Sequence, residues 1–240
     1  EYGEELSFSS TNPRFGLVWA PVEKLWFKVL YGTAFRAPSF ADLGSQNTPI
    51  LGNTDLKPEE IATTECMAEY QFTRNLSGSL GYFDVRAREL IRMGYSEGIY
   101  QYENVGKMKS DGVEARLKVM GGKDRYACLN FTWQDVKDTT HAKIEGTDKR
   151  QKDFNPGGIP EFYGNLILNH DITENIIGNI SLNYVGERER SGEEVWNVEK
   201  QEPEQKDKRD PVDERWLLNA SLTFRDVITR GLEFQFSGYN

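Results

Sequence analysis

The chain has 240 residues, 38% of them hydrophobic and 12% aromatic, which is enough for one sizeable all-β domain. Its mean hydropathy of −0.64, without any run near the roughly 18 consecutive apolar residues that a membrane helix needs, excludes a helical membrane protein. The net charge of −9 argues against nucleic acid as a partner, because phosphate binding needs a basic surface.

Apolar and polar side chains alternate along many segments, and a period of two indicates β-strands with one apolar face. In residues 216–224, for example, the even positions from Trp216 to Phe224 are apolar and point one way. The odd positions Leu217, Asn219, Ser221 and Thr223 point the other way, because successive side chains of a strand lie on opposite faces. The predicted strands, in chain order, are residues 14–20, 25–35, 64–72, 76–90, 112–119, 127–133, 162–170, 176–186, 216–224 and a last one from 232.

The connections between these strands alternate between short and long. Short turns are expected at residues 22–24, 73–75, 121–124, 171–175 and 226–231, and long loops at 37–60, 137–158 and 188–213. In an up-and-down antiparallel sheet every second connection returns to the same side, so the short turns should share one end and the long loops the other.

This asymmetry predicts an all-β fold, an antiparallel up-and-down transmembrane β-barrel to which the chain contributes about ten strands. The alternative is a soluble β-sandwich, in which aromatic residues would sit anywhere along the apolar face. Here the aromatic residues fall near strand ends, as the interface girdles of a membrane barrel require: Trp19, Trp26, Trp133, Tyr184, Trp216 and Phe224.

Three local features carry further expectations. Pro21 should end the first strand, because proline cannot donate to the ladder. The apolar face changes between Tyr82 and Phe83, which predicts a β-bulge there, and a loop is expected at residues 94–106. Cys66 and Cys128 lie on opposite strand faces by alternation, so no disulfide should join them.

A more specific pattern begins at Tyr31, where the sequence reads YGTAFRAPSFADL, followed by GNTDLKPE from Gly52. With NVG at 104–106 and DGVE at 111–114, it resembles the barrel of TonB-dependent outer-membrane receptors. The residues that carry the motif, for which the resemblance implies a structural role, are Phe35, Arg36, Ala37, Pro38, Asn53, Leu56, Pro58, Glu59 and Glu65.

The resemblance implies a barrel of about 22 strands around an N-terminal plug, in the outer membrane of a Gram-negative bacterium. Residues 1–240 would then be a partial barrel, with the plug and the earlier strands absent from this chain. It further implies active uptake of a scarce ligand, energised by the TonB–ExbB–ExbD complex through the missing N-terminal region, with membrane lipid and lipopolysaccharide as neighbours. A passive porin-type channel, a surface adhesion barrel, and a cobalamin or glycan receptor of the same architecture remain alternatives.

Ligand contacts would come from the long loops, and the candidates are Arg36, Gln46, Asn47, Arg150 and Trp196. Trp196 lies among charges that offer it no apolar cover, so we expect an exposed ring that stacks on a flat ligand or anchors its loop. Arg36 is also expected to tie the base of its loop to Asp42 or Glu59.

A small basic cluster formed by Lys149, Arg150 and Lys152 is either a solvated loop or a contact for an anionic siderophore or a lipopolysaccharide phosphate.

No enzymatic activity, metal site or cofactor is expected. His141 and His170 are far apart, with no cysteine or second histidine at ligand spacing, and no nucleophile lies beside a base. Haem receptors of the family carry a histidine between the two halves of the Tyr31 motif. In this chain residues 39–52 contain no His, Tyr, Met or Cys, the usual ligands of haem iron, so we expect a ferric siderophore instead.

Overall fold

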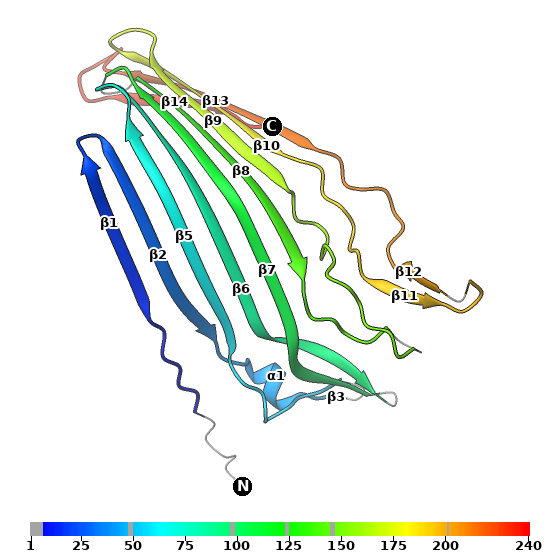
Figure 1. The fold of residues 1–240 in the computed structure, drawn as a ribbon. Coiled ribbons are helices and arrows are strands. Elements are labelled where there is room, and N and C mark those ends of the chain that lie inside the picture. The colour runs from blue at the N-terminus through cyan, green and yellow to red at the C-terminus, as the bar shows by residue number, and fades with distance from the viewer. Residues whose placement is uncertain (1–6, 48–49, 97–98, 123–124, 145–146, 201) are drawn as a thin grey trace.

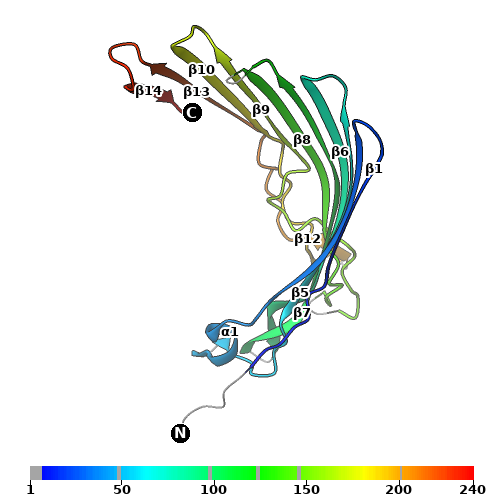
Figure 2. The ribbon, with the colours of Figure 1, turned by 90° about the vertical axis from the view of Figure 1, so that its left-hand side faces the viewer.

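The computed structural model describes residues 7–47, 50–96, 99–122, 125–144, 147–200 and 202–240. Ten strands pair antiparallel with their neighbours in chain order and form one curved, open wall with β1 and β14 at its edges (Figures 1 and 2). They are β1 (Arg14–Val22), β2 (Leu25–Arg36), β5 (Glu59–Gln71), β6 (Leu76–Ser96), β7 (Ile99–Met120), β8 (Tyr126–Asp138), β9 (Phe162–Asp171), β10 (Ile176–Val185), β13 (Arg215–Arg225) and β14 (Glu233–Gly238). The all-β antiparallel prediction is confirmed.

The short turns all lie at one end of the wall and the long connections at the other, as predicted (Figure 1). The long connections contain small elements that the alternation did not reveal: α1 (Phe40–Gly44), β3 (Gln46–Asn47), β4 (Ile50–Leu51), and a separate hairpin of β11 (Glu194–Asn197) and β12 (Glu202–Gln205). In the described part of the chain no helix is long and apolar enough to cross a membrane.

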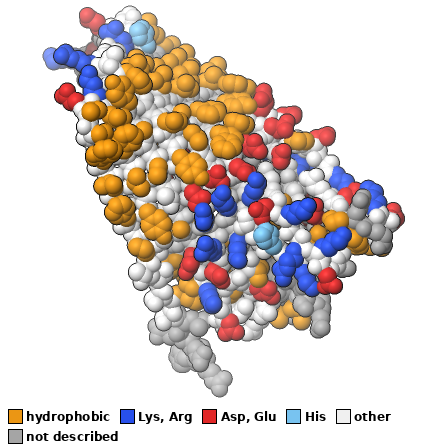
Figure 3. Space-filling model, viewed as in Figure 1, with side chains coloured by type: hydrophobic (Ala, Val, Ile, Leu, Met, Phe, Trp, Pro, Cys, Tyr) orange, Lys and Arg blue, Asp and Glu red, His pale blue; other side chains and the backbone are white. Residues whose placement is uncertain are grey.

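The strand register gives the wall two chemically different faces. Residues paired across β5 to β8 line up as Cys66, Tyr82, Val113 and Trp133 on one face, which we call the outer face. Residues one position along each strand lie on the opposite, inner face. Figure 3 shows apolar side chains covering the half of a wall face nearest the short turns, with charged side chains gathered toward the long connections.

Little of the chain is buried within the wall itself. Among the described residues, prolines aside, the buried apolar side chains are Leu56, Ile144 and Ile177, two of which belong to the long connections. The large apolar side chains of the outer face, such as Trp216 and Leu218, are about half exposed. A single layer of this kind buries its apolar face against its surroundings, which agrees with a membrane wall.

The expectation that Pro21 ends the first strand was wrong. Strand β1 runs on to Val22, and Pro21 lies where the register shifts between Trp19 and Val22. Pro21 has no partner in the β1–β2 register, so its missing N–H removes no paired position of that ladder.

The bulge was predicted at the wrong place. Tyr82 and Phe83 pair regularly with Val113 and Gly112, and Phe83 lies on the inner face, where a Cβ added at Gly112 would be 2.6 Å from its Cζ. The register instead breaks between Ala87 and Ile91, where Glu89 has φ 53°. Phe83 is therefore an inward residue filling the space beside a glycine.

The expectation of a loop at residues 94–106 was also wrong. Strands β6 and β7 remain paired as far as Ser96 and Ile99, and they have 21 and 22 residues. Cys66 and Cys128 are both free and lie on opposite faces, as predicted.

Candidate functional site

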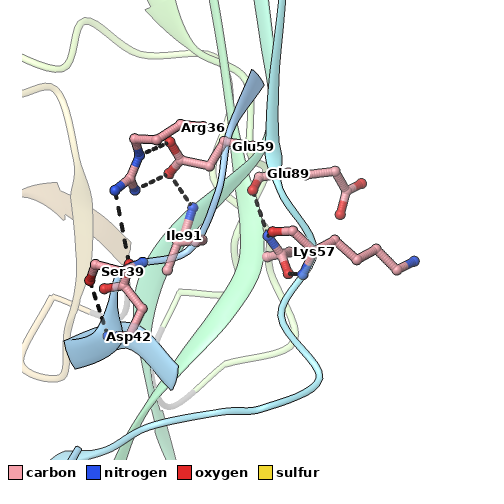
Figure 4. Close-up of polar contacts among 8 residues, drawn as sticks. Arg36, Ser39, Asp42, Lys57, Glu59, Glu89 and Ile91 are labelled. Carbon is pink, nitrogen blue, oxygen red and sulfur yellow. Dashed lines mark hydrogen bonds and ion pairs between the residues drawn. The ribbon is translucent and has the colours of Figure 1, made fainter. Parts of the chain in front are cut away.

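An ion pair closes the base of the connection between β2 and β5. The register places Arg36 directly opposite Glu59, and Arg36 donates from Nε to Glu59 Oε2 at 2.5 Å and from Nη2 to Oε1 at 2.8 Å (Figure 4). The hydrogen bonds raise the pKa of Arg36 and lower the pKa of Glu59. Arg36 Nη1 also lies 3.9 Å from Asp42 Oδ2, so both carboxylates named from the sequence contact it.

Asp42 belongs to a capping box that starts the short helix α1. The Ser39 hydroxyl accepts a hydrogen bond from the Asp42 N–H at 3.2 Å, and Asp42 accepts one from the Ser39 N–H at 2.8 Å. The same carboxylate therefore starts α1 and faces Arg36, which fixes the helix against the end of β2.

The bulge in β6 is held by two side chains of the sequence motifs. Glu59 Oε1 accepts a hydrogen bond from the Ile91 N–H at 2.8 Å. Asn104 donates to the carbonyls of Glu89 at 2.7 Å and Lys57 at 2.9 Å, and it accepts from the Lys57 N–H at 2.7 Å. Backbone groups that the bulge displaces from the ladder thus find partners.

Two further motif residues fasten the connection across the extended end of β7. Asn53 donates to the Tyr102 carbonyl at 2.9 Å and accepts from the Asp55 N–H at 2.9 Å. Leu56 is buried beneath this segment, at 4% exposure.

The remaining motif residues differ in burial: Pro38 is buried, Pro58 half-buried, and Phe35, Ala37 and Glu65 are exposed. The contacts of Glu59, Asn104 and Asn53, with the pairing of β4 to β7, hold residues 37–47 and 50–58 against the ends of β6 and β7.

Of the five residues predicted to contact a ligand, the structure describes the side chains of four. The side chain of the fifth, Asn47, lies outside the described part. Gln46 is exposed on β3. Arg150 is exposed and donates to the His141 carbonyl at 3.1 Å. Lys152, next in the predicted basic cluster, is exposed as well.

Trp196 is half-buried and not exposed as expected, because Lys149 Nζ lies 4.7 Å from its ring centroid and Pro203 pairs with it across the β11–β12 hairpin. The ring and the lysine fasten the two long loops to each other.

The structure thus separates the candidates into two groups. Arg36 and Gln46 belong to the connection after β2, whereas Arg150 and Trp196 belong to the loops after β8 and β10. Among the described residues, no hydrogen bond or ion pair joins one group to the other.

A polar cavity of about 290 Å³ between the two long loops was not foreseen. Its lining includes Arg92, Gln151 and Glu193, and Arg92 Nη1 lies 2.5 Å from Oδ2 of Asp138, which is 1% exposed. Gln151 donates to the Glu194 carbonyl at 3.2 Å and so ties the loops together. No local pattern marks these residues, because strand pairing and loop packing bring them together from distant parts of the sequence.

The described residues hold no group of three or more His, Cys, Asp or Glu side chains placed to bind a metal ion. His141 Nε2 lies 2.6 Å from Asp153 Oδ1, within one loop.

The comparisons with known proteins agree with this architecture. The model of the family described as TonB dependent receptor-like, beta-barrel matches residues 2–240. A search of the curated proteins finds no match to the sequence.

Among solved structures, a mutant of the ferric enterobactin receptor PfeA from Pseudomonas aeruginosa is 19% identical with a TM-score of 0.72, covering 95% of this chain and 34% of that one. The ferric-catecholate import receptor Fiu from E. coli K12 is 19% identical with a TM-score of 0.63, covering 95% and 30%. The siderophore receptor PirA from Pseudomonas aeruginosa is 15% identical with a TM-score of 0.63, covering 95% and 36%. The chain therefore spans about a third of the length of these receptors, and at this identity the likeness shows the fold.

Proposed function

This chain belongs to the TonB-dependent receptor β-barrel family, and from that premise we propose that it forms part of the barrel of an outer-membrane receptor that imports a scarce ligand. The location is then the outer membrane of a Gram-negative bacterium. The remaining strands of a barrel of about 22 and a plug domain would be supplied by segments outside residues 1–240.

The observation that carries the proposal is the contrast between the two faces of the wall. The outer face is apolar near the short turns. The inner face carries a polar network in which Arg116 donates to Asn130 at 3.0 Å and Asn130 donates to Asn165 at 2.7 Å. Asn179 likewise donates to Asn169 at 3.2 Å. A lipid-facing surface backed by a polar lumen is what a transport barrel requires.

The ligand of this receptor is proposed to be a ferric siderophore or a similar iron chelate. The solved structures named above are described as a ferric enterobactin receptor, a ferric-catecholate import receptor and a siderophore receptor. The cavity lined by Arg92, Gln151 and Glu193 supplies polar groups at the long-loop end, where a ligand arrives first. Gln46, Asn47, Arg150, Trp196 and Arg36 remain the candidate contacts, with the last already engaged by Glu59.

Energy for uptake is proposed to come from the TonB–ExbB–ExbD complex acting on the N-terminal region of the full-length protein. A passive porin-type channel is the alternative of a different class, and a cobalamin or glycan receptor would differ in ligand alone. No catalytic step is part of the proposal.

Uptake by cells separates these alternatives. Cells that express the full-length protein should accumulate a radiolabelled ferric siderophore, and disabling TonB should abolish the accumulation. Uptake that persists without TonB would support a passive channel and overturn the proposal.

The loop contacts are tested by replacing Arg150 and Trp196 together (Arg150→Gln, Trp196→Ala). Siderophore affinity should fall, whereas Arg74→Gln, an exposed residue in a short turn at the opposite end, should leave it unchanged. Equal affinity in both variants would remove these two residues from the site.

A further inference from the structure

The inner face of the wall changes from charged to neutral between β7 and β8. One row of directly paired positions shows the change, because Glu69 on β5 and Arg116 on β7 are followed by Asn130 on β8, Asn165 on β9 and Asn183 on β10. Other inner-facing charges along the middle of the wall also lie on β2, β5 and β7: Lys28, Glu65, Glu114 and Lys118.

Beyond β7 the inner face stays neutral over three successive rows of paired positions. In the described strands, the inner-facing residues of these rows on β8, β9, β10, β13 and β14 include no charged side chain. Six of them are asparagines, all half-buried, which we call the amide strip: Asn130, Asn165, Asn169, Asn179, Asn183 and Asn219. The strip crosses strands that lie side by side in Figure 1.

The side chains of the amide strip are hydrogen-bonded to neutral neighbours. Asn130 donates to Asn165 at 2.7 Å, and Asn179 donates to Asn169 at 3.2 Å. The Ser181 hydroxyl accepts from Asn183 at 3.3 Å and from Asn219 at 3.4 Å. Each amide has two donor hydrogens and an acceptor oxygen, so one such bond leaves capacity for a further partner. The strip therefore offers neutral donors and acceptors to whatever lies against it.

A hollow marks the end of the amide strip nearest the long loops. It has a volume of about 410 Å³, and its lining includes Asn130, Gln134 and Tyr163. The inner face of β8 continues from Gln134 to Asp138, which lines the polar cavity between the two long loops. A ligand held at that cavity would therefore meet the amide strip first as it moved toward the short turns.

We propose that the amide strip is the side of the lumen along which an anionic iron chelate passes from the long loops toward the short turns. The inference rests on the proposed receptor function and adds a route to it. A group in transit needs contacts that are favourable enough to admit it and weak enough to release it. Neutral amides meet both conditions for the oxygen atoms of a chelate.

The charged part of the inner face is less suited to such movement. Lys28 and Arg116 would retain an anionic chelate, whereas Glu65 and Glu114 would repel it. An amide neither retains nor repels a charged ligand strongly, which is why we place the route on β8 to β13 and not on β2 to β7.

The test introduces charge into the strip and measures binding and uptake separately. Cells that express the full-length protein receive a radiolabelled ferric tris-catecholate, which is anionic. In the nearly isosteric variant Asn165→Asp/Asn179→Asp/Asn219→Asp, uptake at saturating chelate should be about tenfold slower, because carboxylates lower the local concentration of an anion. Affinity at the cell surface, measured without an energy source, should stay unchanged because the loops set it.

The matched control Thr63→Asp/Ser79→Asp/Ser110→Asp adds the same charge at half-buried, inner-facing positions of β5, β6 and β7. Its uptake should equal that of the parent. The variant Asn165→Lys/Asn179→Lys/Asn219→Lys should also import slowly, because cations retain the anion. Heat-modifiable migration checks that each barrel is folded.

Uptake slowed equally in the control, or unchanged in the aspartate variant, would overturn the route. A weaker surface affinity in the aspartate variant would also overturn it, since the strip would then belong to the initial binding site. Faster uptake in the lysine variant would contradict the need for neutral contacts. If the parent neither binds nor imports the chelate, the proposed receptor function fails together with the route, whereas import by the parent with normal import by the aspartate variant refutes the route alone.

Discussion

At the scale of single residues, Glu59 connects three strands that alternation alone treats as independent. It binds Arg36 at the end of β2, begins β5, and accepts the Ile91 N–H beyond the bulge of β6. The Glu59 side chain is 15% exposed and that of Arg36 is 56% exposed, so the backbone contact should outweigh the ion pair.

We therefore predict that Glu59→Ala loosens the base of the connection by about 1–3 kcal/mol, the usual cost of leaving a shielded donor without its acceptor. Hydrogen exchange at Ile91 and across residues 37–58 should accelerate. The control is Glu60→Ala, which removes an exposed carboxylate one position along. Unchanged exchange in Glu59→Ala would contradict the structural role.

Gly106 allows a close approach at the same bulge. A Cβ at this position would lie 2.6 Å from Leu90 Cβ and 3.0 Å from the Leu90 carbonyl oxygen. Gly106→Ala should therefore lower stability by about 1–3 kcal/mol through overpacking, measured as a lower temperature of heat modification of the full-length barrel. Gly44→Ala, where no atom lies within 4 Å of the added Cβ, should leave that temperature unchanged.

At the scale of elements, contacts between charged side chains stabilise the β11–β12 hairpin. Hydrogen bonds from Lys208, Asn197 and Lys200 lower the pKa of Glu204 from 4.5 to about 2. Because the pKa is lower in the folded hairpin, the stabilisation is fully present above pH 4.5 and is lost as the pH falls toward about 2.

The hairpin should accordingly lose hydrogen-exchange protection within that pH window, before the main wall does. In Glu204→Gln the loss of protection with falling pH should largely disappear, because the titrating group is gone. Protection that stays constant in the parent from pH 4.5 down to about 2 would show that Glu204 does not hold the hairpin.

The elements that the sequence predicted are those defined by local alternation. Strand faces, the ends of the short turns and the separation of Cys66 from Cys128 depend only on odd and even positions along one strand. The place of the bulge does not, because the bulge lies among contacts with other strands, such as those of Glu59 with Ile91 and of Gly106 with Leu90.

The sequence did not predict the β11–β12 hairpin or the polar cavity. Both depend on contacts between residues of different segments, which alternation along one strand does not reveal. Pro203 and its acidic neighbours have the composition of a loop, yet Pro203 pairs with Trp196. Arg92 on β6 and Asp138 at the end of β8 meet because both strands pair with β7, and the long loops complete the cavity around them. The Arg36 contacts were foreseeable because a sequence motif names both partners, but their role in binding a ligand stays a prediction.

At the scale of the whole molecule, an open sheet is not stable by itself in lipid. The edges at β1 and β14 expose backbone groups, and each unsatisfied group costs several kcal/mol in hydrocarbon. The wall is therefore stable in a membrane only when both edges pair with further strands. The inner polar network of Asn130 and Asn165 would then face an enclosed lumen.

A prediction about the ligand of that lumen is that it is not haem. Residues 39–52 provide no His, Tyr, Met or Cys, so this connection has no side chain of the kind that commonly ligates haem iron. Its capping box and exposed Gln46 provide polar groups that suit an oxygen-rich chelate. Spectral titration of the full-length receptor with haemin should give no sharp Soret shift, and excess ferric siderophore should bind unhindered by haemin. A tight haemin complex whose Soret shift disappears on substitution within residues 39–52 would contradict the prediction, because it would place an iron ligand where the chain offers none.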